Sequence, residues 1–417
     1  MKLKDILQTR TFRQSILTIF ATVTSGVLGL LFYMLVARIL GPYNFGIFAV
    51  ATATLTLIAD MGDLGADSGI IRFVNKYRDE RPKALRFLKL AFESKVLVWL
   101  TISSLGWLIT PYIVDNFFKK PELTDVLRFT LLGIGGVMLL SFSSHAIQAY
   151  QKYKVWSVLL VMSNLIRFLV ITFLALNLTL NLQNTLFTYI LIPFVFFIIG
   201  LFFLPNFFQA KKEFGLFKEF YSFNIWVFLI SIIAVVSSRM DIFLTTKFLS
   251  IEQVGIYSAA IQLTSFIPQL SFAIATVAAP KFSSLESKGE VIAYLKKLQL
   301  FVLGLAVLGL IGIPVGYMII SYLYGQAYVA SFTPFVILYI AQLIFLIALP
   351  VQQSIFYFFA KPQVFVPVAL GQLSIMIFLG VRLINTFGIT GAALTVLVGN
   401  LFLFLLPTFW VIYQFKK

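Results

Sequence analysis

The sequence predicts an all-α polytopic membrane protein with about 12 transmembrane helices in two six-helix lobes. Of its 417 residues, 60% are hydrophobic and only 12% are charged, whereas soluble domains carry about 25% charged residues. The apolar residues are spread along the whole chain in runs of roughly 20, the length at which a helix crosses the hydrocarbon core. The two halves of the chain also match each other at a constant offset, which indicates a parallel repeat.

Twelve apolar spans are expected, separated by short connections. The first lobe, residues 1–210, contains the spans near 13–37, 43–71, 88–114, 124–148, 154–177 and 185–206. The second lobe, residues 211–417, contains the spans near 220–246, 253–281, 296–323, 332–358, 363–384 and 389–414. The longest connections carry most of the charge and are too short to form a soluble domain; they lie around 72–87 and 207–219.

The basic residues indicate the orientation, because cytoplasmic loops are enriched in Lys and Arg. With a cytoplasmic N-terminus, the inside segments carry 24 basic residues, eight of them from Arg72 to Lys95, and the outside segments carry five. We therefore expect both termini to be cytoplasmic. The net charge of +16 is then a topology signal and an attraction to anionic membrane lipids, and no nucleic acid partner is expected.

Neither a metal centre nor a hydrolytic site is expected. The chain has no cysteine and one histidine, His145, so thiolate-metal sites are excluded and a histidine site lacks nearby ligands. The sequence contains neither a P-loop nor a GxSxG nucleophile elbow. Its start, MKLKDILQTRTFRQS, is basic and leads directly into an apolar span, so no cleavable signal peptide is expected. We expect no cofactor.

The internal repeat is clearest where RILGPYNFGIFAVA (38–51) aligns with KFLSIEQVGIYSAA (247–260), an offset of 209 residues. The register continues without a gap to residues 73 and 282, with Gly46 over Gly255. Each half holds an even number of spans, so the two copies have the same orientation and are related by an axis along the membrane normal. Transporters built in this way bind substrate between their two lobes.

Several of these segments carry a resemblance to a known family. ARILGPYNFGIFAVA, ADMGDLGADSGIIRF and SSRMDIFLTTKFLSIEQVGIYSAA resemble segments of polysaccharide-biosynthesis flippases, which move lipid-linked O-antigen or capsule repeat units. That family belongs to the superfamily of the MATE multidrug exporters and the lipid II flippases. The resemblance implies a MATE-like fold, in which two lobes surround a central cavity that opens alternately to either side of the membrane.

The resemblance also implies a function. The chain would be a transporter rather than an enzyme, placed in the cytoplasmic (inner) membrane of a bacterium. Its substrate would be an undecaprenyl-pyrophosphate-linked oligosaccharide, and its partners would be membrane lipids, a polysaccharide polymerase and chain-length machinery. Transport is expected to use an ion gradient, of protons or sodium, or the downstream consumption of the product.

Two alternatives stay open beside this function. One is a MATE-type cation-coupled multidrug antiporter, whose cavity would use acidic groups to bind cationic drugs. The other is a membrane-embedded polysaccharide polymerase or ligase. Such enzymes carry a large external catalytic loop, and the predicted spans leave no outside loop longer than about a dozen residues.

Aspartates interrupt the second span, in LIADMGDLGADSGIIRF (57–73). An ionised carboxylate is costly in hydrocarbon, so such groups usually face a cavity or a partner. Asp60 and Asp63 are therefore predicted to face a water-filled cavity, and Gln269 is the repeat equivalent of Asp60. The family resemblance adds Asp241, in the seventh span, to these coupling or cavity groups.

Asp67, in the same stretch, has a second interpretation. At the cytoplasmic interface it would pair with Arg72 or Lys76, and Asp63 would lie beside it. Exposed ion pairs of this kind contribute only about 0–1 kcal/mol.

Four cations are candidates for binding the phosphates of a lipid-linked sugar. Arg167 lies near the middle of the fifth span and Arg239 in the outer half of the seventh, and the planar guanidinium suits phosphate oxygens. Arg72 and Lys281, which align in the repeat, flank the cytoplasmic mouth and would attract an anionic headgroup. The alternatives are a structural ion pair for Arg239, a structural or snorkelling role for Arg167, and ordinary positive-inside anchoring for the other two.

Overall fold

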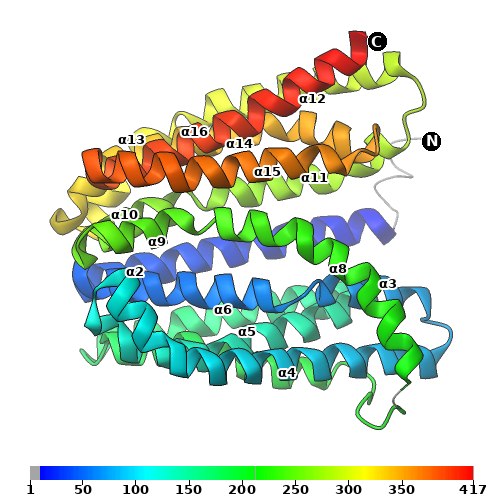
Figure 1. Ribbon diagram of the computed structural model, residues 1–417, viewed down its shortest axis with the longest axis horizontal. Helices are drawn as coiled ribbons and strands as arrows, with labels where there is room; N and C mark the ends of the chain where they lie inside the picture. The colour runs from blue at the N-terminus through cyan, green and yellow to red at the C-terminus, as the bar shows by residue number, and fades with distance from the viewer. Residues whose placement is uncertain (1–9, 212, 417) are drawn as a thin grey trace. The chain divides into compact units, whose positions relative to one another are not determined.

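The computed structural model of the protein describes residues 10–211 and 213–416 (Figure 1). Every regular element in these ranges is a helix, which confirms the all-α prediction. Four lysines that contribute to the predicted topology lie outside the described residues: Lys2, Lys4, Lys212 and Lys417.

Contacts within the chain divide it into two compact units. Unit 1 comprises the residues up to Phe32 and Ile47–Val235, whereas unit 2 comprises Tyr33–Gly46 and the residues from Val236 onwards. The helices of unit 1, after the long helix α2 (Arg10–Gly62) that both units share, are α3 (Ala66–Lys76), α4 (Arg81–Ile113), η1 (Val114–Phe118), η2 (Pro121–Leu123), α5 (Thr124–Ala149), α6 (Tyr153–Leu176), α7 (Leu182–Leu201) and α8 (Phe214–Ser237).

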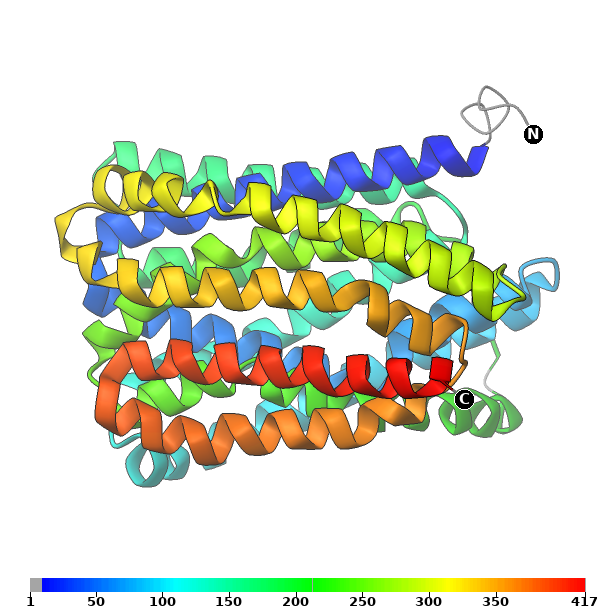
Figure 2. The ribbon, with the colours of Figure 1, turned by 90° about the horizontal axis from the view of Figure 1, so that it is seen from above.

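The larger segment of unit 2, from Val236 onwards, begins with the short helix α9 (Met240–Phe248). The helices that follow are α10 (Ile251–Thr264), α11 (Phe266–Ser283), α12 (Lys288–Gly309), α13 (Gly312–Met318), η3 (Ile319–Tyr324), η4 (Gln326–Ser331), α14 (Phe332–Tyr357), η5 (Pro362–Val364), α15 (Phe365–Ser374), η6 (Ile375–Leu379) and α16 (Gly380–Lys416). Figure 2 shows α12 and α14 side by side in this unit, and the two helices are in contact.

Nine stretches of the described residues are long and apolar enough to cross a membrane. Two of them contain a sharp break that makes two passes, at Gly41 (φ 71°) in α2 and at Gly388 (φ 59°) in α16. Glycine adopts positive φ without steric cost, and both breaks lie in connections that the hydropathy predicts. With α8 and α9 as the seventh pass, the described chain has the twelve helical passes expected.

The second predicted span, 43–71, is wrong as one continuous helix. α2 ends at Gly62 and α3 begins at Ala66, because Leu64 (φ 50°) and Gly65 (φ 76°) both take left-handed backbone conformations. The turn is closed by the Ala66 N–H, which donates to the Asp63 carbonyl over 2.8 Å. Asp63 stands directly before Leu64 and Gly65, and Asp67 is the second residue of α3.

In each unit the helix of the fourth pass is largely buried. α5 packs on α3, α4 and α7, and α14 packs on α10, α11, α12 and α16. These two helices, Thr124–Ala149 and Phe332–Tyr357, occupy equivalent places in the repeat. α4 and α6 bury few residues in their most apolar windows, as helices do when one face is turned to lipid.

Candidate functional site

The broken end of α2 directs two carboxylates towards a buried lysine. Lys95, on α4, has only 1% of its side chain exposed, and its Nζ lies 2.5 Å from Asp63 Oδ1 and 2.8 Å from Asp67 Oδ1. The Asp67 N–H donates to Asp63 Oδ2 over 3.2 Å, which holds the two carboxylates on the same side of the turn. The three charges therefore come from both sides of the helix break and from the neighbouring helix.

Two side chains of α5 complete this cluster. Ser141 Oγ donates to Asp67 Oδ2 over 2.5 Å, and His145 Nδ1 lies 3.2 Å from Asp67 Oδ1. The same nitrogen is 2.9 Å from the Ser141 carbonyl oxygen. We call Asp63, Asp67, Lys95, Ser141 and His145 the lysine cluster. It joins α3, α4 and α5 of unit 1 through polar groups that would be costly to bury singly.

In the structure, Asp67 pairs with residues other than those that the sequence predicts. The interfacial alternative names Arg72 or Lys76, whereas the structure pairs Asp67 with Lys95 and His145. Lys95 counts in the sequence only as one of the positive-inside residues, although it is buried. The position of Lys95 could have indicated its burial, because it lies two turns into the apolar part of its helix, apart from the other basic residues of the 72–95 segment.

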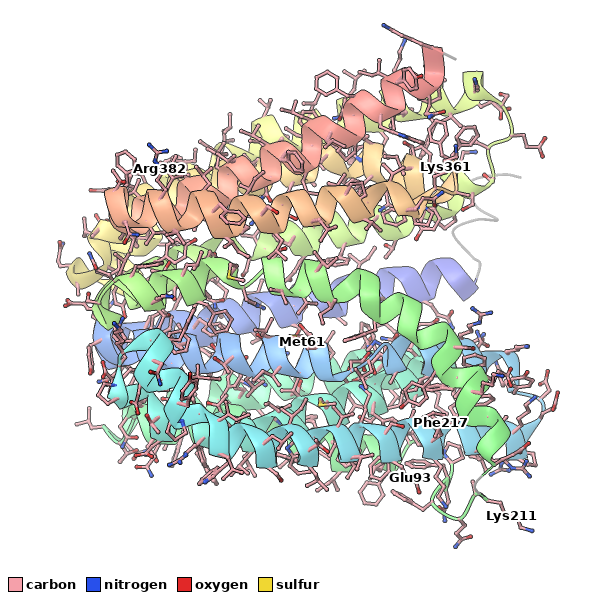
Figure 3. The ribbon with its side chains drawn as sticks, viewed as in Figure 1. Met61, Glu93, Lys211, Phe217, Lys361 and Arg382 are labelled. Atoms are coloured by element: carbon pink, nitrogen blue, oxygen red, sulfur yellow. The ribbon has the colours of Figure 1, made fainter. Side chains whose placement is uncertain are left out.

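Asp60 and the candidate Arg72 lie outside this buried core. Both side chains belong to exposed residues, and the Arg72 guanidinium carbon is 5.6 Å from the ring centroid of Phe73. Met61, which Figure 3 labels, marks this part of α2. The prediction that Asp60 faces a cavity therefore stays a prediction, as does a phosphate-binding role for Arg72.

Arg167 on α6 is held by aromatic rings. Its guanidinium carbon lies 4.5 Å from the centroid of Tyr189 on α7 and 5.9 Å from that of Phe32 on α2. Tyr189 is itself fixed by an edge-on contact with Phe48, at 5.5 Å between centroids. The buried Nε of Arg167 has no hydrogen-bond partner, and the ion pairs among the described residues do not include this arginine.

The candidates in unit 2 lie at the start of α9 and on α11. Asp241, in the first turn of α9, is buried and accepts a hydrogen bond from the Tyr257 hydroxyl of α10 over 2.9 Å. Arg239 directly precedes α9 and is half-buried. Gln269 and Lys281 lie on α11, half-buried and exposed respectively. Among these four candidates, Asp241 is the one whose side chain accepts a buried hydrogen bond from another described side chain.

A small basic pocket lies where α4 meets the segment before α8. The Arg86–Glu213 ion pair and a 2.7 Å hydrogen bond from Lys89 Nζ to the Ala210 carbonyl hold this segment against α4. Figure 3 shows Glu93, Phe217 and Lys211 at the same end of unit 1, and all three line the pocket. Two of its cations, Arg86 and Lys89, are already matched by acceptors of the adjoining segment, so the pocket is a structural contact of α4.

Comparison with known proteins identifies the family. A family described as "Polysaccharide biosynthesis protein" matches residues 12–286, about two thirds of the chain. Comparison with curated protein sequences gives no match.

Solved structures resemble nearly the whole chain. The lipid II flippase MurJ in an inward closed conformation has a TM-score of 0.76 at 17% identity, covering 96% of this chain and 89% of that one. An inward-facing multidrug resistance MATE transporter of the MOP superfamily has a TM-score of 0.73 at 11% identity, covering 96% and 98%. A MOP superfamily transporter from Pyrococcus furiosus, with a binding pocket of reversed polarity, has 0.66 at 11%, covering 97% and 95%. These similarities confirm the predicted MATE-like fold.

Proposed function

This chain belongs to the polysaccharide biosynthesis protein family, and from that premise we propose that it flips undecaprenyl-pyrophosphate-linked oligosaccharide repeat units across the bacterial cytoplasmic membrane. It is a multi-pass membrane protein with a fold that transporters and a lipid flippase share. In the proposed cycle the substrate site opens alternately to the two sides of the membrane. Flipping makes and breaks no covalent bond, so the proposal includes neither a catalytic residue nor a cofactor.

Arg167 is the observation that supports this substrate best. A lipid-linked sugar carries a pyrophosphate that loses its water as it crosses the membrane, and a fixed cation must replace that water. Arg167 lies in the middle of a membrane-spanning helix, ordered by Tyr189 and Phe32, and has no carboxylate partner among the described residues. Its guanidinium stays charged when desolvated, and its donors fit phosphate oxygens in pairs.

The other candidates have supporting roles in this proposal. Arg239 would be a second phosphate contact, and Arg72 and Lys281, both exposed, would attract the anionic headgroup at the cytoplasmic side. Asp60 and Gln269 would contact the sugar or take part in ion coupling, by protons or sodium. Asp63 and Asp241, whose carboxylates are already held by Lys95 and Tyr257, would take part in ion coupling alone.

The experiment replaces Arg167 and measures export in cells that depend on this protein. Arg167→Ala should reduce surface polysaccharide per unit of membrane-inserted protein by about 10- to 100-fold, because hydrogen bonds to charged groups contribute about 1.5–3 kcal/mol. Arg167→Lys should recover part of the export, since it restores charge without the planar fork.

Arg128→Ala is the matched control for this experiment. Its guanidinium carbon also lies near an aromatic ring, 5.2 Å from Trp107, but its Nε donates to the Trp107 carbonyl. Export by Arg128→Ala should stay within about twofold of wild type. Equal export by Arg167→Ala and Arg128→Ala would remove Arg167 from the phosphate-binding role.

The MATE-type multidrug antiporter is the second candidate, favoured by the MATE structures that share this fold. A cationic drug needs an accessible carboxylate. Among the candidate aspartates, Asp60, which is exposed, is the one such group, since Asp63 and Asp67 are paired with Lys95 and Asp241 accepts a hydrogen bond from Tyr257. Drug resistance conferred by the wild-type protein, together with unchanged polysaccharide export after its deletion, would favour this candidate over the flippase.

A further inference from the structure

The lysine cluster contains the one histidine of the chain, and its contacts define which nitrogen can titrate. His145 Nδ1 lies 2.9 Å from the Ser141 carbonyl oxygen and 3.2 Å from Asp67 Oδ1. The carbonyl oxygen and the carboxylate are acceptors only, and the third neighbour, Ser141 Oγ at 3.2 Å, gives its hydrogen to Asp67, so Nδ1 must carry a hydrogen. Nε2 is therefore the nitrogen that gains or loses a proton. The side chain is 31% exposed and lies four residues before the end of α5 at Ala149.

The charged partners beside His145 come from α3, α4 and the turn that ends α2. Asp67 belongs to α3 and Asp63 to the turn that ends α2, whereas Lys95 comes from α4. Tyr221 of α8 interacts electrostatically with Asp63 and Lys95. α7, which also packs on α5, contains no Asp, Glu, Lys, Arg or His. The remaining ionisable residues of the elements packed on α5 lie on α3 (Arg72, Lys76), α4 (Arg81, Lys83, Arg86, Lys89, Glu93, Tyr112), η2 (Glu122), α6 (Tyr153, Lys154, Arg167) and α7 (Tyr189), and the end of α2 beside the cluster carries Asp60.

The protonation of His145 decides the net charge of this cluster. Two carboxylates and one ammonium give a net charge of −1 when the imidazole is neutral, and 0 when it is protonated. A net charge is costly to bury, whereas a neutral set of paired charges is tolerated. The cluster is therefore built to accept one proton.

The position of the cluster connects this proton to the backbone. Asp63 and Asp67 stand on either side of the break between α2 and α3, where two residues have positive φ. Asp67 contacts cations of two different helices, Lys95 on α4 and His145 on α5. With His145 protonated, Asp67 holds α3 to both helices through charge. With His145 neutral, the attraction to α5 is reduced to hydrogen bonds, and Lys95 becomes the main partner.

We propose that His145, within the lysine cluster, is the proton-binding site that couples transport to a proton gradient. The proton enters from water and binds to Nε2, which neutralises the cluster and fixes α3 against α5. When the proton is released, the end of α2 beside the helix break is free to move. This inference rests on the proposed transport function and names its coupling ion and site. Lys95 is the fixed counter-charge that keeps both carboxylates ionised throughout the cycle.

The first test observes the proton directly, because one histidine gives one set of imidazole signals. The full-length protein, labelled with ¹⁵N-histidine in nanodiscs of zwitterionic lipid, is titrated from pH 5 to 9 by NMR. Nε2 should change from an unprotonated to a protonated nitrogen as the pH falls, while Nδ1 keeps its hydrogen. Asp67→Asn should lower the midpoint by about 1–3 pH units, since it removes a nearby opposite charge.

Asp125→Asn is the matched control in this titration. Asp125 is an exposed residue at the other end of the same helix, α5, and its substitution should leave the midpoint unchanged. A histidine that keeps one protonation state across the whole pH range would overturn the inference. So would a midpoint that Asp67→Asn and Asp125→Asn leave equally unaffected.

The second test connects the proton to transport. His145→Asn keeps an N–H donor near the position of Nδ1 but cannot titrate; His145→Gln replaces it if the first variant fails to insert. In proteoliposomes with an imposed proton gradient, a protonophore should slow wild-type flipping of undecaprenyl-pyrophosphate-linked oligosaccharide at least fivefold. The variant should flip at a low rate that the protonophore does not change.

The outcomes separate the two proposals. Flipping by His145→Asn that is as sensitive to the protonophore as the wild type would overturn the coupling role alone. Absence of flipping by the wild type, under conditions where the NMR titration succeeds, would overturn the proposed substrate and leave the proton-binding site established.

Discussion

Replacement of the buried lysine should destabilise unit 1 more than any other single charge removal. Lys95→Met keeps the length of the side chain but leaves Asp63 and Asp67 without the ammonium that lies 2.5 and 2.8 Å away. Removing one partner from a buried ion pair costs about 3–5 kcal/mol. For a unit of roughly 200 residues this corresponds to a thermal midpoint lower by about 6–20 °C.

The pH dependence of this variant has a definite sign. Without the ammonium, two carboxylates face each other at the break, so binding of a proton to one of them removes their repulsion and stabilises the fold. This stability is present at low pH and is lost as the pH rises. The difference between Lys95→Met and wild type should therefore become smaller as the pH falls from 8 to 5.

The assay is thermal unfolding of the purified protein in detergent, followed by tryptophan fluorescence. Lys89→Met is the control on the same helix: its ammonium donates to the Ala210 carbonyl at a half-buried site, and its loss should cost about 1 kcal/mol. The triple variant Lys95→Met, Asp63→Asn, Asp67→Asn should recover most of the lost stability because no unpaired charge remains. Equal midpoints for Lys95→Met and Lys89→Met would refute this reasoning.

Three further predictions concern other parts of the chain. Tyr257→Phe leaves Asp241 without its hydroxyl donor and should cost about 1–3 kcal/mol, measured as a lower unfolding midpoint than that of Tyr322→Phe, an exposed tyrosine. Gly255→Ala places a methyl group 1.9 Å from the Pro42 carbonyl oxygen and should reduce the yield of folded protein, whereas Gly289→Ala, in open space, should not. Cysteines at Lys83 and Asn116 should react with impermeant reagents from opposite sides of the membrane; labelling of both from outside would contradict the predicted topology.

Much of the fold follows from patterns that depend on short stretches of sequence. Runs of about 20 apolar residues mark the passes, and Gly41 with Pro42 marks the sharp turn between the first two. The repeat also predicts the equivalence of α5 and α14, which both lie at the centre of their units. These features are local or periodic, so hydropathy and spacing are enough to find them.

The lysine cluster depends on contacts that no local pattern contains. The spacing of Asp63 and Asp67 indicates that they share a side, but their partner comes from 28 or more residues further along the chain. Lys95 has the sequence appearance of an interfacial anchor, and only packing of α4 against α3 buries it. The break at Leu64 and Gly65 does not interrupt the hydropathy pattern, because it is a single turn within an otherwise continuous run.

The most direct test of the proposed function is flipping by the purified protein in liposomes. The substrate is an undecaprenyl-pyrophosphate-linked oligosaccharide with a fluorescent label on its sugar, and a membrane-impermeant reductant reports how much label reaches the outer leaflet. In nearly all vesicles that contain the wild-type protein, the label should become accessible to the reductant. In vesicles that contain Arg167→Ala, the label should become accessible about 10- to 100-fold more slowly. Two results together would contradict the flippase function and identify a drug antiporter: the label stays as protected from the reductant as in liposomes without protein, and the same vesicles exchange a cationic drug for protons.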